Sequence, residues 1–423
     1  MADWWVMCGV PFVLILAAIG SIFVAFNNGA NDVANAFASA VGSKALKIRH
    51  ALFIAAALNF LGAILLGGNV SKTLIDGIVN VRHLDDGSAY IIGMFACMVA
   101  SGCFIFVSTH TGLPVSSTHA IVGGMVGIAI ATGGAAAVNW KSVVSLVLSW
   151  VFAPFLAASC SFATIKLIRY TIYRGDQDEI MDRACRWIPL FASIAVLAVT
   201  VAIINGIKFF ENFRLWIVYL SLLPIAPVMY VVFRAVTRKL AVKFEKRGTF
   251  AIEHVFRRFQ AGTSCMIGLA IGSNDVANSI SPVVAVYFVK KLGTMPDSFS
   301  SFEIPIWMLA MGGIGMSIGV LSLGHKVIGT LGKNITLLTN SRGFSVDFST
   351  ATTIILASVF GIPISSTHAA TGSIIGVGLE NGFGELNLRL LLKIFVTWFL
   401  TVPLSAIFTV LVYLLLRAFV LLF

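Results

Sequence analysis

Two short polar segments lie inside stretches of the chain that are otherwise apolar. Residues 26–35 read FNNGANDVAN, and residues 269–278 read LAIGSNDVAN. In the first segment Asp32 and Asn35 are three residues apart, so both side chains lie on one face of a helix. The second segment repeats this spacing. A carboxylate at membrane depth costs about 2.5–3.5 kcal/mol on insertion scales, so it normally faces a cavity or a binding partner.

These carboxylates and amides together predict a cation site. Hard cations such as Na⁺ are bound by oxygen ligands, and the carbonyls of an unwound helix can complete the shell. Glycine and clustered asparagines weaken a helix, so we expect a broken helix in both segments. In the alternative interpretation the aspartates only cap these breaks, but such a cap need not recur in duplicate inside a membrane. The predicted sodium ligands are Asp32, Asn35, Asp275 and Asn278, with Asn28, Asn31 and Asn274 as secondary candidates.

A second repeated motif predicts an anion site. Residues 112–120 read GLPVSSTHA, and residues 361–369 read GIPISSTHA. Pro114 cannot donate a hydrogen bond inside a helix, whereas serine and threonine are good helix N-caps. We therefore expect two re-entrant hairpins whose tips present hydroxyls and free N–H groups, as at helix N-termini that bind phosphate or sulfate. The predicted anion-binding residues are Ser116, Ser117, Thr118, Ser365, Ser366, Thr367, Asn35 and Asn278.

An alternative role for these hydroxyls is to bond neighbouring helices, which is common in membranes. Each motif also contains one histidine, His119 or His368. Neither has a partner at metal-ligand spacing, so we favour a structural hydrogen bond over a proton relay or a metal site. The glycine-rich stretches at 123–127 and 312–315 lack the lysine that follows a nucleotide-binding loop, and they predict close helix packing.

The elements that must position these residues are membrane-spanning helices. Of the 423 residues, 58% are hydrophobic and 11% are charged, and the mean hydropathy is +0.95. A soluble protein of this length could not cover its surface with so few charges. Apolar stretches such as 10–26, 90–107 and 188–204 have the length that spans a bilayer. The sequence predicts an all-α polytopic membrane protein of about twelve membrane segments.

The net charge of +11 lies mainly in predicted loops. Eight basic residues between positions 234 and 258 lie beside a predicted span and mark the cytoplasmic side. No nucleic-acid recognition module accompanies this charge, so nucleic acid is not an expected partner. The six cysteines form no CxxC pair, and we expect neither a disulfide framework nor a metal site among them.

Both motifs recur in the same order and at nearly the same separation, which indicates an internal duplication. Asp32 and Asp275 are 243 residues apart, and His119 and His368 are 249 apart. Loop charges place the start of the first repeat outside and the start of the second inside, which makes the repeats inverted in topology. Both chain termini are then expected outside. The predicted units are repeat 1 at 1–170, a central two-helix insert with a basic cytoplasmic loop at 171–257, and the inverted repeat 2 at 258–423.

At these residues the chain resembles the inorganic phosphate transporter (PiT) family of sodium- or proton-coupled symporters. Residues 29–35 and 272–278 match its paired signature, and the two hairpin motifs look like those of the family. The resemblance spans almost the whole chain. It implies a phosphate held by the hairpin tips and the broken first helices, with Na⁺ bound at the aspartates.

The chain departs from some relatives of that family at a few polar positions. Some relatives carry acidic residues in the region where this chain has Asn59 and Lys72, while Asp347 preserves an acid in repeat 2. The roles of these three residues, and the number of coupled cations, are left open.

From these observations we expect a multi-pass transporter of the plasma (cell inner) membrane that moves inorganic phosphate in symport with Na⁺. Proton coupling, sulfate as the anion and a homodimer are left open. A membrane enzyme acting on phosphate esters would need a nucleophile, base or metal cluster, and an anion channel would need basic rings, which neither motif supplies. The expected partners are phosphate, Na⁺ and the lipid bilayer, with no organic cofactor and no nucleic acid.

Overall fold

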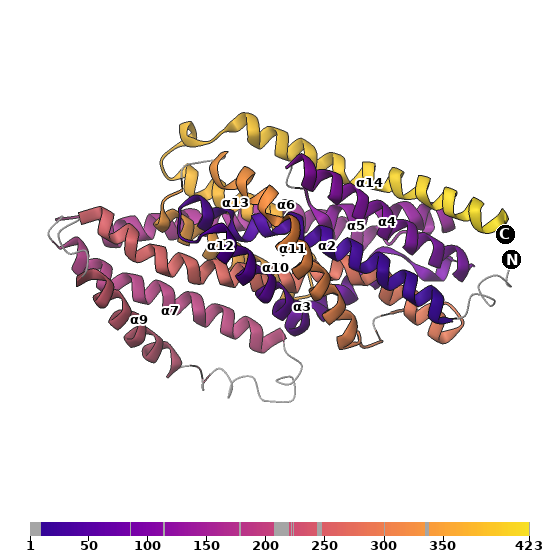
Figure 1. Ribbon diagram of the computed structural model, residues 1–423, viewed down its shortest axis with the longest axis horizontal. Helices are drawn as coiled ribbons and strands as arrows, with labels where there is room; N and C mark the ends of the chain where they lie inside the picture. Colours follow the sequence, from indigo (N-terminus) through magenta and orange to yellow (C-terminus); the bar gives the residue numbers. More distant parts are fainter. Residues whose placement is uncertain are drawn as a thin grey trace.

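The computed structural model describes residues 10–84, 86–112, 115–176, 179–206, 220, 222, 224–242, 248–299, 301–334 and 338–422. The N-terminal helices are α2 (Val10–Gly42), α3 (Ile48–Ile78), α4 (Gly87–Thr111), α5 (Ser117–Gly133) and α6 (Trp140–Ile168). The central helices are α7 (Ile180–Gly206) and α9 (Ile225–Val242). The C-terminal helices are α10 (Gly248–Leu292), α11 (Ile306–Asn334), α12 (Asn340–Val359), α13 (Ser366–Leu379) and α14 (Leu388–Leu422). Figure 1 shows these helices bundled along one long axis.

Seven of the described helices are long and apolar enough to cross a membrane, namely α2, α3, α4, α6, α7, α11 and α14. Their exposed surfaces are rich in large apolar side chains such as Phe155 on α6 and Phe399 on α14. This confirms the predicted all-α membrane class. The count of about twelve membrane segments stays a prediction, because the remaining helices are shorter or carry polar motifs.

The helix breaks predicted at the Asn-Asp segments are wrong. α2 runs without interruption through residues 26–35, and α10 runs through 269–278. A Cβ atom on Gly29 would lie 2.0 Å from the carbonyl oxygen of Met316, so this glycine lets α2 and α11 cross closely and does not end the helix. The Asn27 side chain donates to the Phe23 carbonyl 2.8 Å away, one turn back in the same helix. The polar residues are accommodated because they face protein groups and not lipid.

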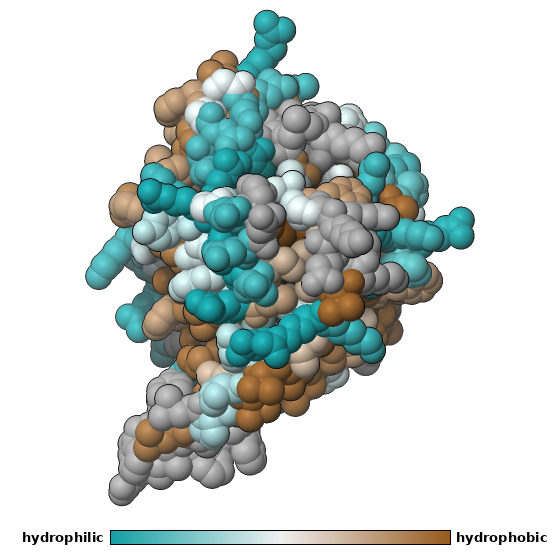
Figure 2. All heavy atoms as spheres, turned by 90° about the vertical axis from the view of Figure 1, so that its left-hand side faces the viewer, coloured by the Kyte–Doolittle hydropathy of each residue, from teal (hydrophilic) through white to brown (hydrophobic). Residues whose placement is uncertain are grey.

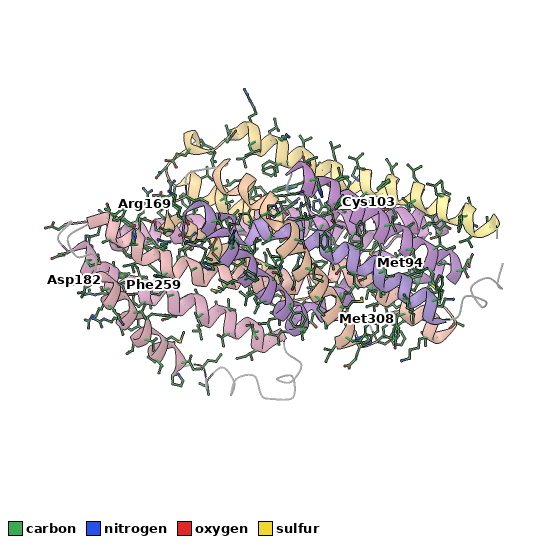
Figure 3. The ribbon with its side chains drawn as sticks, viewed as in Figure 1. Met94, Cys103, Arg169, Asp182, Phe259 and Met308 are labelled. Carbon is green, nitrogen blue, oxygen red and sulfur yellow. The ribbon has the colours of Figure 1, made fainter. Side chains whose placement is uncertain are left out.

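One end of the molecule is polar. Figure 3 labels Arg169 at this end, and Figure 2, which looks onto it, shows hydrophilic side chains gathered there. Arg257 Nε, near the start of α10, donates to Ala45 O after α2 over 3.4 Å. Asn340 Nδ2, at the start of α12, donates to Ser43 O over 3.2 Å. The segments predicted to be cytoplasmic from their basic charge therefore meet at a single end.

A hydrogen-bond network on the surface at this end lowers the pKa of the Glu385 carboxylate. The Glu385 carboxylate accepts from Asn381 Nδ2 at 2.6 Å and from Arg342 Nη2 at 2.9 Å. These hydrogen bonds, of which the one from Asn381 has the largest effect, hold the pKa of Glu385 below its ordinary value of 4.5.

Corresponding helices of the two halves run in opposite directions. α3 begins next to Ala45 at the polar end, whereas α11 begins at the other end, where Asp76 Oδ1 accepts from Phe299 N at 2.7 Å. The start of α2 and the end of α14 also lie together at that far end, the right-hand end of Figure 1. The inverted repeat and the placement of both termini outside stay predictions.

The two hairpins enter from opposite ends. Ala137, just after α5, accepts from Asn80 N at 2.8 Å, so α4 and α5 both have their outer ends at the far end. Glu380, just after α13, pairs with Arg169 at 2.9 Å, so the outer ends of α12 and α13 lie at the polar end. The proline and serine motifs therefore lie at the tips of two helical hairpins inside the molecule, and their re-entrant placement in the membrane stays a prediction.

Glycines let the second helix of each hairpin touch the backbone of a long helix from the other half. A Cβ atom on Gly123 of α5 would lie 2.4 Å from Val402 O of α14. A Cβ atom on Gly372 of α13 would lie 2.3 Å from Pro154 O of α6. The packing role predicted for the glycines at 123–127 is confirmed at Gly123. These close contacts pack each hairpin against a helix of the other half.

Candidate functional site

The two aspartates are buried inside α2 and α10 and are bonded by the hairpin of their own half. Asp32 and Asp275 are both 0% exposed. Ser117 Oγ donates to Asp32 Oδ2 at 2.9 Å, and Ser366 Oγ donates to Asp275 Oδ2 at the same distance. The tip of each hairpin is therefore held to the carboxylate that precedes it in the chain.

The amides that follow the aspartates by three residues bond the hairpin of the opposite half. Asn278 Nδ2 donates to the hydroxyls of Ser117 and Thr118, both at 3.2 Å. Asn35 Nδ2 donates to Thr367 Oγ1 at 2.9 Å and lies 3.5 Å from Ser366 Oγ. The structure thus brings the predicted carboxylates, amides and tip hydroxyls into one reciprocal network between the halves.

The hairpin tips also bond each other directly. Thr118 Oγ1 donates to the carbonyl of Ile364 at 3.3 Å, and Thr367 Oγ1 donates to the carbonyl of Val115 at 3.2 Å. All four residues are at most 3% exposed. In this state the two tips are closed on each other.

The remaining predicted residues shape the tips. The hydroxyls of Ser116 and Ser365 each accept a backbone N–H at 3.2 Å, from the residue three positions on, and so cap α5 and α13. Asn31 Oδ1 accepts from Val115 N, and Asn274 bonds both the N–H and the carbonyl of Ile364. These four side chains hold the tip backbone in place, a role that their residue types alone did not distinguish from direct ligand contact.

Among the predicted sodium ligands, three buried amide oxygens have no hydrogen-bond donor within the described residues. They are Oδ1 of Asn28, Asn35 and Asn278. An amide oxygen accepts but cannot donate or take up a proton, and burying it unpaired is costly. Such oxygens beside two carboxylates suit a cation that prefers oxygen ligands. The predicted sodium residues therefore fit the chemistry of the ion.

The hydrogen bonds that hold the two aspartates come from neutral side chains. Asp32 and Asp275 lie close enough to interact electrostatically, and no lysine or arginine takes part in the hydrogen bonds described above. An oxyanion could not enter beside two ionised carboxylates unless cations entered with it. The arrangement can therefore link anion binding to cation binding.

Comparison with known proteins identifies the family. A model described as "Phosphate transporter family" matches residues 28–409. The chain belongs to the phosphate transporter family. A putative phosphate permease of Pyrococcus abyssi is 38% identical over 95% of this chain and 97% of its own length. Another from Thermococcus kodakarensis is 37% identical, covering 94% of this chain and 96% of the relative.

A solved structure shares the fold of this transporter. It is entitled "The sodium-dependent phosphate transporter", and it superposes with a TM-score of 0.89 at 40% identity. The match covers 96% of this chain and 99% of that structure. The transporter thus has the fold of that protein over nearly all of both chains.

The sequence motifs did not reveal every polar group near the site of this transporter. Thr109 Oγ1 accepts from Asn31 Nδ2 at 3.2 Å, yet it lies before the hairpin motif and no repeated signal marks it. Asp347, to which the sequence assigned no role, is 0% exposed and accepts hydrogen bonds from the hydroxyls of Ser39 and Ser264. This third buried carboxylate lies among α2, α10 and α12, toward the polar end.

Asn59 and Lys72, the other two residues whose roles the sequence left open, differ in their surroundings. Asn59 is buried in α3 with both amide atoms unpaired among the described residues, and its backbone oxygen would lie 2.2 Å from a Cβ atom on Gly272. Asn59 therefore marks the close crossing of α3 and α10. Lys72 is half-buried further along α3.

Proposed function

We propose that this transporter carries inorganic phosphate across the membrane in symport with Na⁺. The observation that carries the proposal is the duplicated network of carboxylate, amide and hydroxyl groups at the point where the two hairpin tips meet. The family and the fold of the sodium-dependent neighbour support both the anion and the coupled ion.

Phosphate is proposed to bind between the tips. Serine and threonine hydroxyls and the N–H groups at the start of α5 and α13 are neutral donors, and helix N-termini carry partial positive charge that favours an oxyanion. The donors at this position are Ser117, Thr118, Ser366 and Thr367, with the amides of Asn35 and Asn278 beside them. Neutral donors let the anion leave again on the other side of the membrane, which a transporter needs.

Sodium is proposed to bind at the aspartates. A cation on Asp32 or Asp275 offsets the charge that would otherwise repel phosphate. The unpaired oxygens of Asn28, Asn35 and Asn278 favour Na⁺ over a proton, since an amide oxygen can ligate a metal ion but does not ionise. Coupling then follows because the anion binds well only after the carboxylates are neutralised.

The architecture suits alternating access. We propose that residues 1–170 and 258–423 are inverted repeats that rearrange around the site, with 171–257 as an insert; the second boundary falls inside α10. The reciprocal bonds between the tips would break when the site opens to one side. We also propose that the protein lies in the cell membrane with its polar end in the cytoplasm and both termini outside, and that it catalyses no reaction.

The experiment is phosphate uptake into proteoliposomes with an imposed Na⁺ gradient, an imposed H⁺ gradient or neither, with sulfate as competitor. We expect uptake that follows the Na⁺ gradient and survives excess sulfate. Uptake driven equally well by H⁺ alone would overturn sodium coupling, and full inhibition by equimolar sulfate would overturn phosphate selectivity.

A further inference from the structure

Two histidines meet directly behind the hairpin tips. His119 of α5 and His368 of α13 are each 4% exposed, and their ring centroids lie 4.6 Å apart in a nearly perpendicular contact. Each follows a tip threonine, Thr118 or Thr367, in the sequence. Their backbone N–H groups bond the capping serines, but neither imidazole takes part in the binding network described above.

Each imidazole touches both long helices that flank the hairpins. His119 Nδ1 lies 3.1 Å from the carbonyl of Trp398 in α14, and its ring packs 4.0 Å from the ring of Trp150 in α6. His368 Nδ1 lies 2.9 Å from the carbonyl of Trp150, and its ring stacks 3.6 Å from that of Trp398. Each histidine thus bonds the backbone of one tryptophan and packs on the ring of the other, so that four helices are joined at one point.

These contacts fix the tautomer of both rings. A carbonyl oxygen can only accept, so Nδ1 carries the proton in each histidine. Nε2 is then a bare acceptor in the neutral ring, and both Nε2 atoms are buried without a partner among the described residues. The hydrogen bonds of this pair therefore run through Nδ1.

The two bonds are not equally replaceable. Pro154 lies four residues after Trp150 and has no N–H, so the helix cannot supply the usual donor to the Trp150 carbonyl. His368 supplies that donor. The residue four positions after Trp398 is Val402, which does have an N–H, so the bond from His119 is an additional one.

We propose that His119 and His368 are positioning residues of the phosphate site, which fix the two tips across the interface of the halves through their Nδ1–H groups. A ring that loses this bond lets the first turn of α5 or α13 move, and that turn carries the hydroxyls next to the aspartates. The inference rests on the proposed phosphate transport, because phosphate affinity is its main readout.

The test exploits the shapes of two amides. The asparagine amide nitrogen can stand in for Nδ1, whereas the glutamine amide nitrogen stands nearer to Nε2. Uptake rates are measured against phosphate concentration for His368→Asn, His368→Gln and His368→Leu in proteoliposomes. We expect His368→Asn to keep KM nearly unchanged, and the other two to raise KM about tenfold, the effect of one lost hydrogen bond, with a smaller change in maximal rate.

The same three substitutions at His119 should give the same order with a smaller rise in KM. The matched control is His110→Leu. His110 Nδ1 also bonds a backbone carbonyl, that of Phe106 at 3.0 Å, but the side chain is exposed and the bond lies within its own helix. KM of this variant should not change.

Several outcomes would overturn the proposal. If the glutamine variant keeps the wild-type KM for phosphate and the asparagine variant does not, Nε2 is the acting nitrogen. If KM rises in both variants, an ionisable ring is required. Retention by all three variants would remove the positioning role. If the leucine variants fail to fold, the asparagine–glutamine pair still decides the matter, and ¹⁵N NMR of the wild-type imidazoles must show Nδ1–H in both rings. Absence of sodium-driven phosphate uptake by the wild type would instead refute the proposed function, and the NMR measurement would still test the histidine geometry.

Discussion

Removing the tip hydroxyls tests whether the hairpins bind phosphate. Ser117 Oγ donates to Asp32 at 2.9 Å and accepts from Asn278 at 3.2 Å, so it links a carboxylate of one half to an amide of the other. In the other half, Ser366 Oγ donates to Asp275 at 2.9 Å and lies 3.5 Å from Asn35 Nδ2. Ser117→Ala and Ser366→Ala remove one such link each, with little change in volume.

The size of the effect follows from the charge of the groups involved. A hydrogen bond to a charged partner contributes about 1.5–3 kcal/mol, which corresponds to roughly 10–150-fold in affinity. If the hydroxyls only joined helices, their loss would appear in stability instead, at about 0.6 kcal/mol. The two halves make matching contacts, so both substitutions should weaken phosphate binding by similar factors.

The assay measures phosphate affinity and thermal unfolding on the same purified variants. Ser71→Ala is the control, because Ser71 is also 0% exposed but bonds the Gly67 carbonyl of its own helix at 2.7 Å. We expect phosphate affinity to fall at least about tenfold in both tip variants. Their melting temperature should fall as well, because each hydroxyl also bonds a buried aspartate, and the control should keep its phosphate affinity. Unchanged affinity with lowered melting in both tip variants would refute the claim that the tips hold phosphate.

Three further predictions concern packing, pH and topology. Gly376→Ala should destabilise the protein by about 1–3 kcal/mol in thermal unfolding, because the new Cβ would meet a backbone oxygen of α6 at 2.1 Å, whereas Gly68→Ala in open space should not. The pKa of Glu385 is lowered in the folded protein, so its contribution to stability is present above pH 4.5 and is lost as the pH falls through the folded pKa. The difference in melting temperature between the wild type and Glu385→Gln should therefore vanish in acid. A difference that grows in acid would contradict the sign of the shift. A cysteine at Ser88 should react with an impermeant reagent only from outside and one at Thr249 only from inside, and labelling of both from one face would contradict the inverted repeat.

The sequence predicted the parts of the site but not how they pair. Duplication showed that the aspartate and serine motifs belong together, since each recurs at a nearly constant offset. It could not show that Asn278 reaches Ser117 across the interface, because that contact depends on how the two halves pack. The closure of the tips on each other, Thr118 to Ile364 and Thr367 to Val115, is likewise a tertiary feature.

The one clear error concerned local helix propensity. Gly29 and the neighbouring asparagines predicted a broken helix, yet α2 continues through them. The glycine is explained by the close backbone of Met316, and tertiary packing overrides the weak preference of single residues. The buried cluster around Asp347 could not be predicted at all. Its two serine partners come from α2 and α10, and no sequence motif connects them.

The central claim is that the two buried aspartates make phosphate binding depend on Na⁺. The most direct measurement is the binding of phosphate to the purified protein in Na⁺ and in K⁺ at equal ionic strength, for the wild type, Asp32→Asn and Asp275→Asn. We predict strong binding by the wild type only in Na⁺, and loss of this dependence in each variant. Equal phosphate binding by the wild type in both salts, or a sodium dependence that survives in both variants, would contradict the account.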